Sequence, residues 1–177
     1  LWLSSNKGIT KFTPGNSLEG KPTVVNYNNY DGLATEFNTG AYLRDRKGIL
    51  YYGSLDGFYW FKPDDISDNH ILPKTMITGF TVFDKPQPLK PNLSLKHDQN
   101  TLSFTFSSMQ FSLPQKNRYQ YRLLGHETEW VQAGNINSVR YSQLPTGDYI
   151  FQVKSSNYDG IWNENPEQYA FTIAPPW

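Results

Sequence analysis

The sequence contains no cysteine and only two methionines. The lack of cysteine excludes disulfide bonds and cysteine-ligated metal, but it leaves the compartment open because proteins of oxidising compartments can also lack cysteine. Long apolar runs are missing as well. Nowhere do about 18 apolar residues follow one another, so the sequence predicts no membrane-spanning helix within it. The start of the chain does not have the pattern of a secretory signal peptide.

Net charge is a further absence. Sixteen Lys and Arg residues balance sixteen Asp and Glu residues, so no long-range field attracts a nucleic-acid backbone or an anionic membrane. We therefore expect no nucleic-acid partner.

Aromatic residues, glycine and proline are what the sequence has in quantity. Phe, Trp and Tyr make up 16% of the 177 residues, and the 13 glycines and 12 prolines are typical of strands joined by turns. A folded chain of this length buries roughly 70% of the surface that its extended form exposes, which is enough for one or two cores. We predict an all-β protein.

A stretch at the start of the chain comes back further along. LWLSSNKGITKFTP (1–14) and LYYGSLDGFYWFKP (50–63) agree in register at five positions: Leu1/Leu50, Ser5/Ser54, Gly8/Gly57, Phe12/Phe61 and Pro14/Pro63. In each copy the glycine ends a short polar turn between two strands and predicts a tight hairpin. Such units are typical of β-propeller blades, of which a propeller needs about four or more. Residues 1–66 are therefore predicted to be the last blade or blades of a truncated array.

The residue composition of the chain changes after Pro63. The polar stretch DDISDNHILP (64–73) indicates a boundary, and we place a linker at residues 67–74. Residues 75–177 then alternate in the manner of longer strands, which predicts an immunoglobulin- or fibronectin-III-like β-sandwich without the disulfide. Six segments are predicted strands, and WVQAG or LSLKH is expected to supply a seventh: TMITGFTVF, TLSFTFSSMQF, NRYQYRLLG, SVRYSQL, GDYIFQVKSSN and EQYAFTIAP.

Alternation also predicts which side chains face the core. The inward set is Leu102, Phe104, Phe106, Tyr119, Tyr121, Leu123, Tyr149, Phe151, Val153, Tyr169, Phe171 and Ile173. Gln152 and Lys154 are expected to face outward. Tyr149 follows a Pro-Thr-Gly corner at the start of its strand, which favours a tyrosine corner over a plain core aromatic.

Candidate metal sites are weak in this sequence. The histidines His70, His97 and His126 have no partner at zinc spacing, so we interpret them as structural or surface residues. YNNYDG (27–32) has the Asn29, Asp31 and Gly32 of a calcium loop. Tyr27 and Asn38 stand where acidic ligands belong, so a turn is predicted. We expect no metal and no cofactor.

Candidate catalytic groups are equally weak. GSLDG (53–57) lacks the spacing of a nucleophile elbow and lies in a predicted hairpin. The carboxylate pairs Asp64/Asp65 and Glu127/Glu129 are expected to lie in solvated loops rather than to form a glycosidase pair. No glycine-rich phosphate loop is present, and we assign no catalytic residue.

Aromatic residues are concentrated before the boundary, at Tyr51, Tyr52, Phe58, Tyr59, Trp60 and Phe61. They could stack on a sugar ring, but on two adjoining strands half of them must face a neighbouring layer, so packing between blades is favoured. Without its neighbouring blades that face would be exposed, and we therefore expect the isolated chain to self-associate through it.

These residues resemble a known arrangement. Residues 31–63 resemble the two-component regulator propeller repeat, with Tyr51 and Ser54 in place of the usual Trp and Thr; the matching positions are Asp31-Gly32-Leu33, Asp45, Gly48, Gly53-Ser54, Gly57, Phe61 and Pro63. Residues 117–177 resemble more closely the three-tyrosine (Y_Y_Y) domain that follows such repeats, in NRYQYRLLGHETEW, VRYSQLPTGDYIFQVKSSNYDGIWNE and FTIAPPW.

The resemblance implies the periplasmic sensor region of a hybrid two-component histidine kinase of a Gram-negative bacterium, anchored in the inner membrane. In that family a propeller array precedes the sandwich, and a membrane helix and a kinase follow it. Many members sense oligosaccharides, with ligand contacts on the propellers, so no ligand-binding residue is carried over to this chain. The expected partners are a second copy, the upstream propeller and the downstream membrane helix.

The function expected on this basis is non-catalytic coupling. Ligand recognition by the propeller would pass through the last strand, Gln168–Ile173, and the stiff Pro175-Pro176 exit. Two other classes stay open. One is a carbohydrate-binding or spacer sandwich of a secreted polysaccharide-degrading enzyme, and the other is an enzyme in its own right, which would need converging acids or a nucleophile with its base.

Overall fold

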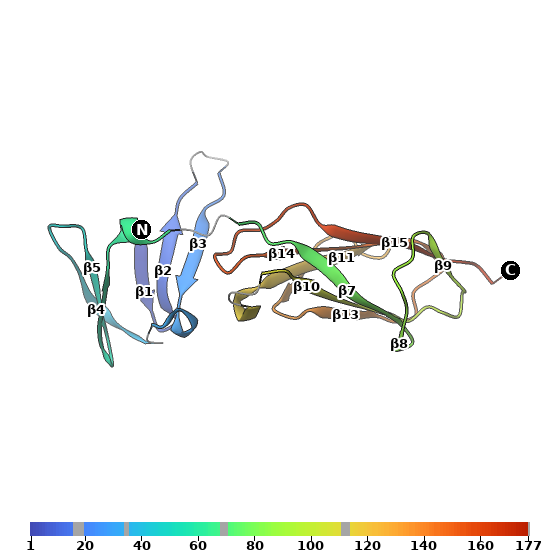
Figure 1. Cartoon of the computed structure of the whole chain (residues 1–177), viewed down its shortest axis with the longest axis horizontal. Coiled ribbons are helices and arrows are strands. Elements are labelled where there is room, and N and C mark those ends of the chain that lie inside the picture. The colour runs from blue at the N-terminus through green and yellow to red at the C-terminus, as the bar shows by residue number, and fades with distance from the viewer. Residues whose placement is uncertain (16–19, 34–35, 68–70, 111–113, 177) are drawn as a thin grey trace. The chain divides into compact units, whose positions relative to one another are not determined.

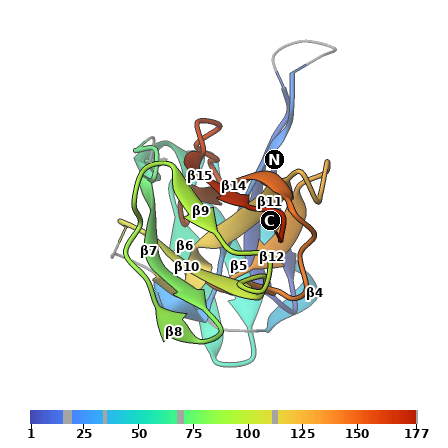
Figure 2. The same cartoon turned by 90° about the vertical axis from the view of Figure 1, so that its right-hand side faces the viewer.

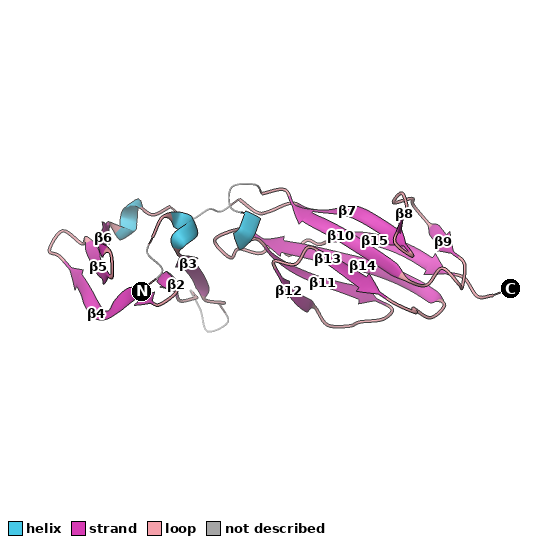
Figure 3. Cartoon of the chain, turned by 90° about the horizontal axis from the view of Figure 1, so that it is seen from below, coloured by secondary structure: helices cyan, strands magenta, loops and turns pink. Residues whose placement is uncertain are grey.

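The computed structural model describes residues 1–15, 20–33, 36–67, 71–110 and 114–176. In these ranges the chain consists of strands, loops and three short 3₁₀ turns (Figure 3), and none of the helical turns is long and apolar enough to cross a membrane. The prediction of an all-β fold is confirmed. The chain divides into two compact units, Leu1–His70 and Ile71–Trp177.

Two antiparallel sheets of three strands form the N-terminal unit (Figure 1). The first contains β1 (Trp2–Ser5), β2 (Gly8–Thr13) and β3 (Thr23–Tyr27), and the second contains β4 (Phe37–Arg44), β5 (Leu50–Ser54) and β6 (Gly57–Phe61). The 3₁₀ turns η1 (Asn29–Asp31) and η2 (Pro63–Asp65) follow β3 and β6.

The sequence repeat corresponds to one hairpin used twice. Ser5 pairs with Gly8 and Ser54 pairs with Gly57, each across a two-residue turn. The glycines have φ values of 110° and 139°, which other residues rarely adopt. In each copy the serine Oγ donates to the glycine carbonyl oxygen, at 3.4 and 3.3 Å. Both predicted hairpins are confirmed, and the serine and the glycine recur because the same turn uses both.

The C-terminal unit is a β-sandwich, viewed in Figure 2 from the end at which the C-terminus lies. One sheet has the order β13-β10-β7-β8 and the other β12-β11-β14-β15-β9. Every pairing is antiparallel except β15 with β9, which is parallel. The strands are β7 (Thr75–Val82), β8 (Lys85–Pro86), β9 (Leu93–Leu95), β10 (Leu102–Ser108), β11 (Arg118–Leu124), β12 (Val131–Gly134), β13 (Ser138–Tyr141), β14 (Gly147–Ser156) and β15 (Glu167–Ile173), with the 3₁₀ turn η3 (Pro114–Lys116) before β11. The six predicted strands all form, and both candidates for a seventh are strands.

The core of the sandwich lies where the inward faces of β10 and β14 meet. Phe104 and Phe151 are completely buried and stack with ring centroids 4.1 Å apart and planes at 8°. Leu102, Phe106 and Val153 are also completely buried. Burial of each such side chain stabilises the fold by about 1.5–3 kcal/mol, so the alternating residues hold the two sheets together.

Lys154 lies on the predicted face of its strand but is shielded from solvent there. It lies on the outward face of β14, as alternation requires, but its side chain is only 9% exposed. Its Nζ lies 4.6 Å from the ring centroid of Trp130 and 5.9 Å from that of Trp162, and it pairs with Glu164 at 2.5 Å. The predicted outward orientation of Lys154 is therefore correct, but aromatic rings cover the side chain instead of leaving it in solvent. Alternation says which face a residue occupies, but not that aromatic side chains from other segments cover that face.

The predicted tyrosine corner is confirmed. The Tyr149 hydroxyl donates to the carbonyl oxygen of Pro145 at 2.7 Å, and the ring stacks on Phe171. The predicted linker at residues 67–74 includes residues 68–70, which lie outside the described ranges.

Candidate functional site

The two acidic pairs singled out in the sequence have different surroundings, each within its own unit. Asp64 and Asp65 lie side by side in η2 and are exposed. Glu129 is also exposed, but Glu127 is half-buried. Its Oε2 accepts hydrogen bonds from the backbone of Leu123 at 2.9 Å and from the Tyr141 hydroxyl at 3.0 Å. The expectation that Glu127 lies in a solvated loop was wrong, because this carboxylate fastens a turn.

The Tyr141 hydroxyl is the most strongly perturbed titratable group in the described ranges. Burial of the ring, followed by the charge of Glu127, raises the pKa of Tyr141 far above its usual range. A proton held this firmly is unsuited to general acid-base chemistry near neutral pH. Tyr141 and Glu127 therefore act as a structural pair.

The two histidines that the structure describes, His97 and His126, do not form part of a metal site. His97 is exposed, and His126 is exposed with its ring edge-on to Tyr141 at 5.9 Å, while His70 lies outside the described ranges. Among the described residues, no group of three or more His, Cys, Asp or Glu side chains is arranged to hold a metal ion. The YNNYDG segment is a turn, as predicted. The Asn28 side chain accepts from Tyr30 N, Asp31 accepts from Asn28 N, and Gly32 ends the turn with φ 84°.

The aromatic residues of β5 and β6 divide between two faces. Tyr52, Tyr59 and Phe61 pack with Ile9 and Phe37 in the core of the N-terminal unit. On the opposite face Phe58 is 67% exposed and Trp60 is 63% exposed. The predicted division between a packing face and an exposed face is confirmed for these residues.

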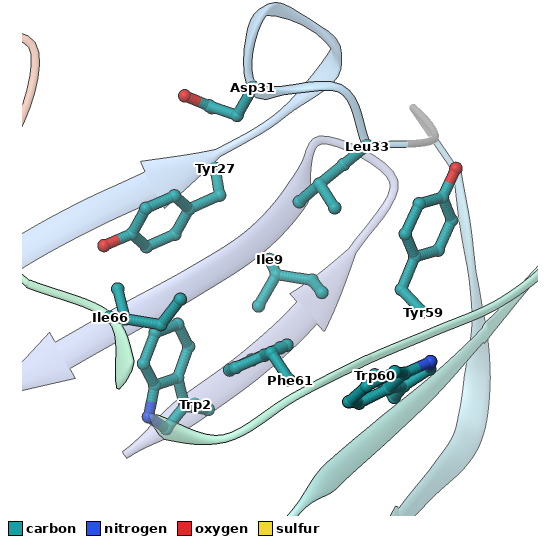
Figure 4. A pocket seen from close by; sticks show the side chains of 9 residues that line it. All are labelled: Trp2, Ile9, Tyr27, Asp31, Leu33, Tyr59, Trp60, Phe61 and Ile66. Atoms are coloured by element: carbon teal, nitrogen blue, oxygen red, sulfur yellow. The ribbon is translucent and has the colours of Figure 1, made fainter. Parts of the chain in front are cut away.

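An aromatic cavity of about 190 Å³ lies in the N-terminal unit (Figure 4). Ile9 lies in the middle of its lining, which comprises Trp2, Ile9, Tyr27, Asp31, Leu33, Tyr59, Trp60, Phe61 and Ile66. Typical sites for small molecules measure about 300–1,000 Å³. Much of the wall is also engaged already, since the Trp2 ring contacts Tyr27 at 5.8 Å and Phe61 at 4.8 Å. The cavity is better explained as a seam between two packed sheets than as a ligand site.

The last strand, β15, is hydrogen-bonded along both edges. It pairs with β14 over all seven of its residues and with β9 over Phe171–Ile173. Ala174 N then donates to Leu95 O at 2.8 Å, which extends the pairing to the residue before Pro175. The chain is thus held firmly up to the point at which it leaves the sandwich.

Side chains add to the hold on β15. The Tyr169 hydroxyl donates to Lys90 O at 2.9 Å, and Thr172 Oγ1 donates to Asp148 Oδ1 at 2.6 Å. Phe171 and Ile173 are almost completely buried. Sequence reasoning found the strand and its inward residues, but it missed the pairing with β9, because three residues are too few to show a period.

Comparison with known proteins gives three findings. Residues 110–174 match the family model of the Y_Y_Y domain. The whole chain is 31% identical over 192 aligned positions to Histidine kinase P4 of Formosa agariphila, and it spans 14% of that protein. The chain also resembles solved extracellular domains of B. thetaiotaomicron, of which it spans about a quarter.

The protein BT3049, described as a hybrid two-component system, has an extracellular domain that matches with a TM-score of 0.78 and 26% identity over 98% of this chain and 24% of that one. The extracellular domain of BT4673, described in one structure as a one-component system, matches with a TM-score of 0.55 and 25% identity over 100% of this chain and 25% of its own. The resemblance found in the sequence is confirmed: the chain is similar to the extracellular part of hybrid two-component sensors.

Proposed function

We propose that this chain, similar over its length to the extracellular part of hybrid two-component sensors and carrying a Y_Y_Y domain match, is the membrane-proximal, non-catalytic part of such a sensor. It couples ligand recognition by an upstream propeller to a transmembrane helix and a histidine kinase. The parent protein sits in the inner membrane with this part in the periplasm. The observation that carries the proposal is the last strand, which is bonded along both edges up to Ala174.

The physical reason is that a strand held on both sides moves with its sheet. Sliding β15 along its axis would break its backbone bonds to β14 and β9 together, whereas a loosely attached strand would yield locally. Pro175 and Pro176 follow at once, and proline fixes φ and restricts the chain. A shift of the sandwich is therefore delivered to the segment that follows instead of being absorbed.

The ligand is an oligosaccharide bound upstream of this chain. That placement is supported by the resemblance to sensors in which the propeller array carries the ligand contacts. Two copies of the sandwich respond by changing their mutual arrangement. Such a switch needs two states that the ligand binds with different affinity.

A flexible insert tests the coupling. In the full-length sensor, a Gly-Ser insert after Pro176 is expected to lower oligosaccharide-dependent kinase activity by about tenfold, within the usual range of coupling between sites, while oligosaccharide affinity is unchanged. An insert of prolines of equal length is the matched control and should retain more of the response. An intact response with the Gly-Ser insert would argue against the proposal. Binding of oligosaccharide by this chain alone would instead favour a carbohydrate-binding module.

A further inference from the structure

The loop between β14 and β15 contains two asparagines whose amide oxygens fold the loop itself. Oδ1 of Asn157 accepts from Asp159 N at 3.0 Å and from Ile161 N at 2.9 Å. Oδ1 of Asn163 accepts from Asn165 N at 3.1 Å. These contacts are local turns of the kind that asparagine commonly makes.

The amide nitrogens of the same two residues reach a distant part of the chain. Nδ2 of Asn157 donates to Ile71 O at 3.2 Å, and Nδ2 of Asn163 donates to Pro73 O at 2.9 Å. These partners are 86 and 90 positions away in the sequence. Both carbonyls belong to residues 71–75, here called the leading segment, with which the C-terminal unit begins.

A third contact joins the same two places. Thr75 Oγ1 and Ser155 Oγ are 2.7 Å apart and both residues are buried. Pro73 is buried as well. The leading segment is thus held by three side-chain hydrogen bonds to residues 155–163, in addition to the pairing of Thr75 with Ser108.

The far side of the loop is fixed to the sheet. Asn163 N donates to Ser155 O at 3.1 Å, and Glu164 accepts from Lys154 Nζ at 2.5 Å. Three residues after Glu164 the chain enters β15 at Glu167. Only Asn165 and Pro166 therefore separate Glu164 from the strand by which the chain leaves the unit.

We propose that residues 155–163 and the leading segment form a latch, in which Asn157 and Asn163 are the positioning residues, and that the two segments open and move as one unit. A displacement of the chain at the start of the C-terminal unit then reaches the start of β15 through side-chain contacts without crossing the whole sandwich. The role of the latch in signalling rests on the proposed function. Its physical content, coupling between two segments, can be measured on this chain alone.

Asn163→Asp separates the two hydrogen-bonding roles of the side chain, which are acceptance by Oδ1 within the loop and donation by Nδ2 to the leading segment. Aspartate keeps the oxygen that accepts from Asn165 N, but it has no N–H to donate to Pro73 O and places a negative charge beside that carbonyl. Asn163 is half-buried, so the variant is expected to fold, whereas a carboxylate at the fully buried Asn157 would be more costly. Asn165→Asp makes the same chemical change two residues away at an exposed position and is the matched control.

Hydrogen exchange of the 177-residue chain tests the latch. Asn163→Asp is expected to speed exchange in peptides covering residues 155–167 and also in those covering 71–78, by about tenfold for the loss of one hydrogen bond to a buried group. Because coupling is reciprocal, Thr75→Val should speed exchange in residues 155–167 as well. Peptides of β10 should be unchanged, which excludes global destabilisation.

Acceleration confined to the mutated side in both variants would overturn the latch, as would an equal effect of Asn165→Asp. The measurement uses neither ligand nor kinase. Its failure is therefore distinct from failure of the proposed function, which the insert after Pro176 decides.

Discussion

At the scale of single residues, buried tyrosine hydroxyls fasten the connections of the sandwich. The Tyr119 hydroxyl accepts from Ser108 N at 3.0 Å, and those of Tyr141 and Tyr149 donate to Glu127 and Pro145. Each ring lies in the core while its hydroxyl fixes backbone or a neighbouring carboxylate. A buried polar group without such a partner would cost about 1–3 kcal/mol. Each of these tyrosines therefore packs its ring in the core and uses its hydroxyl to hold a neighbouring segment.

The Tyr141–Glu127 pair predicts how stability depends on pH. The pKa of Tyr141 is raised in the folded state, first by burial and then by Glu127, while an unfolded tyrosine ionises near pH 10. Below pH 10 both states keep the proton and the stabilisation is complete. Above it only the unfolded state releases the proton, so this pair should lower the free energy of unfolding by about 1.4 kcal/mol per pH unit.

Urea unfolding between pH 9 and 12 measures this slope, with Tyr141→Phe as the comparison. The variant should be less stable at pH 9 but should lose stability more slowly as the pH rises. Burial also raises the pKa of Tyr149 and Tyr169, so part of the slope should persist in the variant. Parallel curves for the two proteins would show that Tyr141 is not held in its neutral form.

At the scale of strands, the sequence predicts which side chains of a strand face the core. It does not predict the contacts that those side chains make with other segments. Alternation placed Phe104 and Phe151 in the core, and both are completely buried. It could not tell that Trp130 and Trp162 cover Lys154, nor that Glu127 accepts from Tyr141, because these contacts join different segments of the chain and alternation within one strand does not reveal them. The amide contacts of Asn157 were invisible for the same reason.

In the short strand β9, truncation of a single side chain should strongly lower the stability of the fold. Leu95 is 5% exposed, lies in the main core and offers its carbonyl to Ala174 N. Leu95→Ala should lower the free energy of unfolding by about 2–5 kcal/mol, because it removes buried methyl groups and leaves a cavity. Faster exchange of the Ala174 amide should accompany this, since β9 holds that edge of β15.

Leu89→Ala is the matched control for this strand. Leu89 is 40% exposed, so its truncation should change the free energy of unfolding by no more than about 0.5 kcal/mol. Denaturant unfolding gives the first quantity and amide exchange the second. Equal effects of the two variants would mean that β9 does not contribute to holding the last strand.

At the scale of the whole molecule, the N-terminal unit carries an apolar face that one chain leaves uncovered. Phe58 and Trp60 on β6 and Leu43 on β4 are more than 60% exposed, and the strand register places them on the face opposite Tyr52 and Tyr59. Large exposed aromatic patches commonly mark interaction surfaces. The relatives extend far beyond the part that this chain matches, which leaves ample chain to supply a cover in a longer protein.

The isolated chain is therefore expected to self-associate through this face. Sedimentation velocity should show a weight-average mass that rises with concentration. Association removes the aromatic rings from water, and each Å² of apolar surface buried in this way stabilises the complex by about 25 cal/mol. Replacing Phe58 and Trp60 together by serine should restore a monomer, whereas Ile136→Ser, at a similarly exposed position of the C-terminal unit, should leave the association unchanged. A monomer at every concentration would show that the chain does not self-associate. Equal effects of the two changes would show that the chain associates through another surface. Association lost only with Phe58 and Trp60 would identify that face as the site of association.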